Sequence, residues 1–163
     1  GRSGSTAAAT PGKICYASTP RCADATAFGA DAFVVMLGTN DAWHHKGEPG
    51  AAAAGVAALL QKLRTAGADR GEGGAEEHPS RPLTFVVLPP GSKAGRLLEN
   101  LRDVVHPGLR RVASEEGAEL VEPLLPAESS YREDAVHLSA AGAVAVATAV
   151  ADALLRVRRP RPA

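Results

Sequence analysis

Three side chains in this sequence have the types and spacing that acyl-transfer chemistry uses: Asp134, His137 and Asn40. Asp134 precedes His137 by three residues in a loop, so its carboxylate can turn back and accept the Nδ1 hydrogen of the imidazole. That bond would fix the tautomer and leave Nε2 as a base. The Asn40 side chain offers an amide donor of the kind that stabilises an oxyanion. The N–H of Gly4 is a natural second donor, because no Cβ blocks close approach.

Each of these patterns also has a purely structural explanation. The residues Gly-Thr-Asn-Asp at 38–41 favour turns and helix caps wherever they occur. An Asp-x-x-His pair arises easily by chance in a chain with five histidines, so His137 can equally be a solvated loop residue near a helix N-cap. The position of these residues relative to the predicted strands therefore has to decide between the two interpretations.

Two apolar runs, 33–37 and 83–88, are too short for ordinary helices and end abruptly in turn residues. We interpret both as strands buried on both faces, the type found in parallel sheets covered by helices. Residues 118–121 form a shorter third strand. Ligands bind beyond the carboxyl ends of such strands, and this is where Asn40 and the loop with His137 are expected to meet.

Helical spacing separates the strands. Apolar residues at 56, 59, 60 and 63 predict a helix over 51–66 with Gly67 as its C-cap, and residues 42–50 between strand and helix read as a polar loop. A second helix covers 94–105, Pro107 kinks or restarts the helix that continues through Leu109, and Ser139 can cap a final helix. This alternation predicts a three-layer α/β/α fold with a parallel, flavodoxin-like sheet.

The composition narrows the function classes. The 163 residues suit a single domain over 1–157 followed by a disordered Arg/Pro tail at 158–163. Eighteen basic and 18 acidic residues cancel, which disfavours nucleic acid and membrane surfaces as partners and favours small molecules or carbohydrate. No run approaches transmembrane length.

The remaining reactive residue types carry weaker signals. His44 and His45 lack a third ligand at a sensible spacing, so we expect neither a metal nor a cofactor. His78 and His106 are expected at the surface. Cys15 and Cys22 can form a disulfide in an oxidising compartment or stay as small buried apolar residues.

Three segments in this order resemble sequence blocks of the SGNH (GDSL-type) hydrolases. They are Gly-Arg-Ser-Gly-Ser-Thr-Ala at 1–7, Leu-Gly-Thr-Asn-Asp at 37–41 and Asp-Ala-Val-His-Leu-Ser-Ala-Ala-Gly at 134–142, which match the second, third and fifth blocks. The resemblance covers essentially the whole chain. It implies that Gly4 and Asn40 are oxyanion-hole donors, that His137 is the general base, and that Asp134 orients it.

The first block of that family, Gly-Asp-Ser, does not occur in this chain. In the family it supplies the nucleophilic serine at the end of the first strand. Ser3 and Ser5 do not fit a G-x-S-x-G elbow, and no strand precedes them. We therefore expect the nucleophile and one or more N-terminal strands to be missing, and the 163-residue chain to be inactive.

The function expected from these residues is that of a serine esterase acting on small acyl esters, with acetylated carbohydrate as one candidate. A non-catalytic carbohydrate-binding or structural domain derived from the same fold is the main alternative. A nucleotide-binding flavodoxin-like domain is a third, but the Gly-rich segment lacks G-x-G-x-x-G.

Overall fold

The structure, a computed structural model, describes residues 5–9, 14–44, 50–68, 82–91, 95–125 and 129–158. Three strands, β1 (Ala32–Val35), β2 (Leu83–Val87) and β3 (Glu119–Val121), form a parallel sheet in the order β1-β2-β3. Val34 lies opposite Phe85 in the first pair, and Val87 lies opposite Val121 in the second. All three predicted strands are present, and the predicted α/β class is confirmed.

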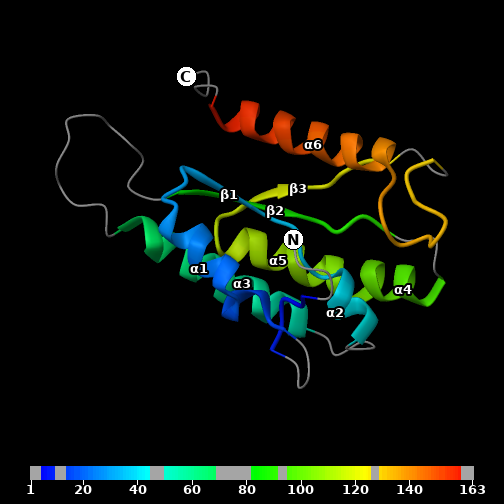
Figure 1. Ribbon diagram of the computed structural model, residues 1–163, viewed down its shortest axis with the longest axis horizontal. Coiled ribbons are helices and arrows are strands. Elements are labelled where there is room, and N and C mark those ends of the chain that lie inside the picture. Colours follow the sequence, from blue (N-terminus) through cyan, green and yellow to red (C-terminus); the bar gives the residue numbers. More distant parts are fainter. Residues whose placement is uncertain are drawn as a thin grey trace.

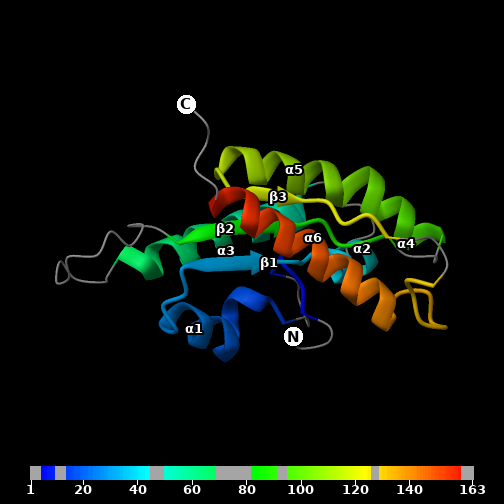
Figure 2. The same cartoon turned by 90° about the horizontal axis from the view of Figure 1, so that it is seen from above.

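Helices cover both faces of this sheet (Figure 1). Of the helices that the structure describes, α6 covers one face, while α1, α3 and α5 lie against the other, with α2 and α4 beyond the carboxyl ends of the strands (Figures 1 and 2). The bounds are α1 Pro20–Ala27, α2 Thr39–His44, α3 Ala51–Ala68, α4 Gly95–Asn100, α5 His106–Glu115 and α6 Ala140–Arg158. A 3₁₀ turn at Tyr16–Ser18 precedes α1, and a π-helical turn at Leu101–Val105 joins α4 to α5.

The main core is formed by the sheet, α3, α5 and the turn that precedes α5. The predicted apolar stripe of α3 is fully buried there, with Val56, Leu59 and Leu60 at 1% exposure or less. A smaller core under α6 contains Phe85 and Ala153. Because β2 is central, both of its faces contribute to these cores, as a near-continuous run of apolar residues predicts.

β1 differs from the prediction of a strand buried on both faces. Val35 is buried, but Val34 is 47% exposed and Met36, just beyond the strand, is 43% exposed. The physical reason is position: among the described residues β1 pairs only with β2, and α6 packs mainly over β3. The predicted burial is therefore wrong for one face of this strand.

The residues after β1 form a helix where a loop was predicted. α2 includes Ala42 and Trp43, and it begins where the N–H of Ala42 bonds the carbonyl of Gly38 at 2.8 Å. The prediction that Gly67 ends the next helix is also wrong, since α3 continues to Ala68. Pro107 was expected to kink or restart the helix, and the helix restarts there: α5 begins at His106, directly after the π-helical turn, with Pro107 in its first turn.

His106 is half-buried rather than on the surface. Its Nε2 lies 2.9 Å from the carbonyl oxygen of Pro89, and burial lowers the pKa of its imidazole. His78 and His45 lie outside the described residues. Both cysteines are free thiols: Cys22 is buried, and the Cys15 thiol lies 3.3 Å from the carbonyl oxygen of Ala7.

The expectation that no run approaches transmembrane length is wrong for α6, by length and composition. Residues Ala140–Val157 have a mean hydropathy of 1.6 and are long and apolar enough to cross a membrane by length and composition. In the structure this helix packs on the sheet, and its outward side chains Val144 and Leu155 are exposed. Residues 159–163 of the predicted tail lie outside the described residues.

Two helical glycines allow close approach of neighbouring backbone. A Cβ at Gly55 would lie 2.2 Å from the carbonyl oxygen of Ala7, and a Cβ at Gly142 would lie 2.2 Å from that of Ser130. Helix α3 can therefore lie directly against residues 5–9, and α6 against the loop that precedes it.

We predict that Gly55→Ala and Gly142→Ala each lower the free energy of unfolding by about 1–3 kcal/mol, because overpacking against backbone outweighs the usual gain in helix propensity. Urea unfolding provides the measurement. Gly95→Ala is the control, since a Cβ there meets nothing within 4 Å, and it should be neutral or stabilising. Equal effects at all three positions would contradict the close-approach explanation.

Candidate active site

The site begins where β1 turns into α2. Gly38 has φ +125°, a backbone conformation that side-chain-bearing residues rarely adopt, and a Cβ there would lie 2.8 Å from Cγ1 of Val105. This glycine therefore permits a sharp turn directly against the core. The turn places Asn40 and Asp41 in the first turn of α2, at the carboxyl edge of the sheet.

Asp41 connects this edge to the start of the described chain. Its side chain is 1% exposed, and its Oδ1 accepts the N–H of Ala8 at 2.9 Å. The N–H of Ala7 reaches both carboxylate oxygens, at 2.9 Å to Oδ2 and 3.1 Å to Oδ1. Segment 5–9 is thereby attached to α2, with the Gly55 face of α3 on its carbonyl side.

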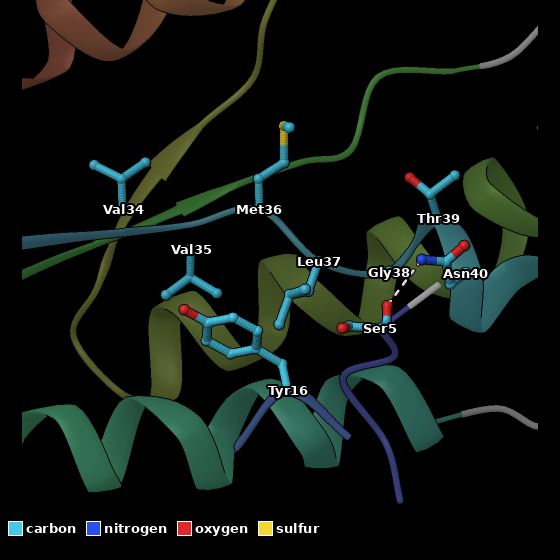
Figure 3. Close-up of a pocket in the computed structure, with 9 residues that line it drawn as sticks. All are labelled: Ser5, Tyr16, Val34, Val35, Met36, Leu37, Gly38, Thr39 and Asn40. Carbon is cyan, nitrogen blue, oxygen red and sulfur yellow. Dashed lines mark hydrogen bonds between the residues drawn. The ribbon is translucent and has the colours of Figure 1, made fainter. Parts of the chain in front are cut away.

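Asn40 extends in the direction of the same segment. Its Nδ2 donates a hydrogen bond of 2.8 Å to the carbonyl oxygen of Ser5 (Figure 3). A primary amide has two N–H donors, so this bond uses one of them. The side chain is half-buried, and its position is set by main-chain atoms rather than by a flexible partner.

A cleft of about 350 Å³ lies along β1 beside this amide. Val35 and Leu37 point to the same side of the strand as Tyr16, while Val34 and Met36 point to the other side (Figure 3). Ser5 also lines the cleft, and its hydroxyl oxygen is buried without a hydrogen-bond partner among the described residues.

Asp134 and His137 form a pair in the loop before α6. Nδ1 of His137 lies 2.6 Å from Oδ2 of Asp134, the contact that their spacing predicts. Oδ1 of Asp134 accepts the backbone N–H of His137 at 2.8 Å and that of Val136 at 2.9 Å. These two backbone bonds, followed by the imidazole, lower the pKa of the Asp134 carboxyl to about 2.

The loop is braced by its own backbone. The N–H of Arg132 bonds the carbonyl of His137 at 2.8 Å, and the N–H of Ser139 bonds that of Ser130 at 2.9 Å. The hydroxyl of Ser139 accepts the N–H of Gly142 at 3.2 Å, which is the predicted N-cap of α6. Ala135 has φ 59°, the left-handed conformation that a tight turn between these bonds requires.

The structure brings the loop and α2 to one edge of the sheet. Segment 129–139 and α2 lie at the same end of the molecule in both views, beyond the carboxyl ends of the strands (Figures 1 and 2). Gly4, the other predicted oxyanion donor, and Ser3 lie outside the described residues. The sequence-based interpretation gave Asp41 no role, although its position directly after Asn40 could have marked it as a residue of the same site.

The arrangement defines a class of protein before any comparison. An α/β/α fold carries a carboxylate-oriented imidazole and a side-chain amide at the carboxyl edge of its sheet. Acyl-transfer hydrolases use these groups as a general base and an oxyanion donor. Residues 1–145 match the model of the GDSL-like lipase/acylhydrolase family. The chain belongs to this family.

Solved structures agree on the fold. The carbohydrate acetylesterase Est24 from Sinorhizobium meliloti superimposes with a TM-score of 0.72 at 22% identity, over 94% of this chain and 75% of that one. The aryl esterase of M. smegmatis gives a TM-score of 0.60 at 20% identity, over 94% and 74% of the two chains. The search of curated proteins returned no match.

We predict that the Asp134 carboxyl titrates at about pH 2 in the folded protein, measured by NMR of its side-chain carbon. Because this pKa lies below the ordinary 3.8, the ionised carboxylate stabilises the loop above pH 3.8, and this contribution is lost as the pH falls through about 2.

His137→Ala is the matched variant for this titration. It removes the imidazole but keeps both backbone donors, which include the largest cause of the shift, so the pKa should rise only part of the way toward 3.8. A wild-type midpoint near 3.8 would contradict the loop geometry described above.

Proposed function

We propose that this protein is a serine esterase of small acyl esters, in which His137 is the general base, Asp134 orients it, and Asn40 and Gly4 donate to the oxyanion. The observation that carries the proposal is the placement of Asn40 and of the Asp134–His137 pair at one edge of a GDSL-family fold. Acetylated carbohydrate is the substrate class suggested by the likeness to Est24, a carbohydrate acetylesterase.

The chemistry follows from the donors and acceptors present. A serine hydroxyl attacks the ester carbonyl while Nε2 of His137 takes its proton, and the carboxylate of Asp134 stabilises the imidazolium through Nδ1. The carbonyl oxygen becomes an oxyanion. The second N–H of the Asn40 amide is available to stabilise it, since the first N–H donates to the carbonyl oxygen of Ser5. His137 then returns the proton to the leaving alcohol, and water repeats the sequence on the acyl-enzyme.

We propose that the nucleophilic serine lies outside the 163 residues of this sequence. Ser5 is a poor candidate, since its hydroxyl is buried and has no partner among the described residues, whereas a nucleophile needs its base within hydrogen-bond reach. We propose that the serine is carried by a strand that pairs with the free edge of β1.

Three observations support a strand at that edge. Among the described residues, β1 pairs on one side only. The cleft of about 350 Å³ follows residues 34–40, and the unpaired hydroxyl of Ser5 lies in its wall. The chain also spans about three quarters of the length of the esterase structures it resembles, 75% of Est24 and 74% of the aryl esterase.

We predict that Asn40→Ala lowers kcat for p-nitrophenyl acetate by about 10²–10³-fold in the protein translated from the complete reading frame, because one oxyanion donor is lost. Asn100→Ala is the control. The Asn100 side chain lies on α4, and its amide also donates to a main-chain carbonyl oxygen, that of Ala42, at 3.0 Å. A wild-type level of kcat in Asn40→Ala would remove Asn40 from the mechanism, and equal losses in both variants would indicate a structural effect.

The 163-residue chain itself should turn over p-nitrophenyl acetate no faster than the buffer does. Turnover that is abolished by Ser3→Ala or Ser5→Ala would contradict the proposed location of the nucleophile. If a complete reading frame encodes no serine on a strand before Gly1, the non-catalytic carbohydrate-binding domain becomes the better interpretation.

A further inference from the structure

Asp41 is a buried carboxylate with a function still to be explained. It is 1% exposed and lies beside Asn40 in the first turn of α2. Moving a carboxylate from water to a protein interior costs several kcal/mol unless hydrogen bonds compensate. Here three bonds of 2.9–3.1 Å from two successive backbone N–H groups provide that compensation.

The bonds of Asp41 lead directly to the amide of Asn40. Ala7 and Ala8, which donate to Asp41, stand two and three residues after Ser5 in one short segment. The carbonyl of Ser5 in turn accepts Nδ2 of Asn40 at 2.8 Å. Asn40 and Asp41 therefore bind the same segment from one turn of helix. Asp41 accepts two backbone N–H groups of the segment, and Asn40 donates to one of its carbonyl oxygens.

We infer that Asp41 is a positioning residue, which orients the Asn40 amide by fixing the segment that carries the Ser5 carbonyl. Without this anchor, the carbonyl of Ser5 would move relative to α2, and the second N–H of Asn40 would lose its fixed direction. The inference rests on the proposed role of Asn40 in ester hydrolysis, but the mechanical link between Asp41 and the amide does not.

A carboxylate suits this task better than an amide does. Ala7 N–H contacts both oxygens of Asp41, so either orientation of an Asn at this position would place an NH₂ group against a backbone donor. Asp41→Asn keeps the size and shape of the side chain, removes its negative charge and replaces one acceptor oxygen by an NH₂ donor. It is therefore a sharper variant than Asp41→Ala, which also leaves a cavity.

NMR of the 163-residue chain tests the mechanical link without reference to activity. In Asp41→Asn we expect faster hydrogen exchange at the amides of Ala7 and Ala8, and the two Asn40 side-chain NH₂ signals should move toward the averaged values of a solvated amide. Leu63→Ala is the control, a core cavity on α3 that should leave the Asn40 signals unchanged. Unchanged Asn40 signals in Asp41→Asn would overturn the inference.

Kinetics of the protein from the complete reading frame test the consequence. Asp41→Asn should lower kcat while KM stays nearly unchanged. The loss should not exceed the one expected for Asn40→Ala, about 10²–10³-fold. Combined with Asn40→Ala, it should cause little further loss, because the two variants remove one function. Leu63→Ala should instead combine multiplicatively with Asn40→Ala.

These outcomes separate the two proposals. Multiplicative losses for Asp41→Asn and Asn40→Ala would overturn the positioning role while leaving the esterase proposal intact. Absence of ester turnover in the wild-type protein would defeat the esterase proposal, and the NMR comparison would still decide whether Asp41 orients Asn40.

Discussion

The bonds between the Asp41 carboxylate and the backbone of Ala7 and Ala8 are the interaction on which the edge of this sheet depends. They join residues more than thirty positions apart in the chain. A buried carboxylate tolerates little movement of its donors, since each lost bond leaves an uncompensated charge. The carbonyl oxygen of Ala7 packs directly against Gly55, at a position that a Cβ on residue 55 would block. Segment 5–9 is thus fixed from both sides.

The two halves of the proposed catalytic apparatus are held in physically different ways. Asp134 and His137 are neighbours in one loop, so their pairing needs only a tight turn and the backbone bonds that brace it. Asn40 depends on a long-range contact, because its partner Ser5 comes from another segment. Loss of tertiary packing should therefore disturb the amide before it disturbs the imidazole–carboxylate pair.

The same distinction explains what the sequence could predict. The stripe of α3, the cap at Ser139 and the contact of Asp134 with His137 are set by spacing within one segment, and all three are present. The three strands were recognisable because a parallel sheet buries short apolar runs.

Features that depend on distant neighbours were predicted wrongly. The exposure of Val34 and Met36 follows from which strand lies beside β1 and where α6 packs, and neither is encoded locally. Residues 42–50 were interpreted as a loop, but 42–44 belong to helix α2, whose start is accompanied by tertiary contacts of Asp41. The half-burial of His106 likewise depends on the carbonyl of Pro89, from another segment.

The central claim is that this edge of the sheet activates a serine through His137. Reaction of the protein from the complete reading frame with a fluorophosphonate probe, followed by mass-spectrometric mapping of the modified residue, tests that claim most directly. The account predicts modification of a single serine, strongly reduced in His137→Ala and retained in the control Asn100→Ala. Modification of Ser3 or Ser5, or labelling that His137→Ala leaves unchanged, would contradict it.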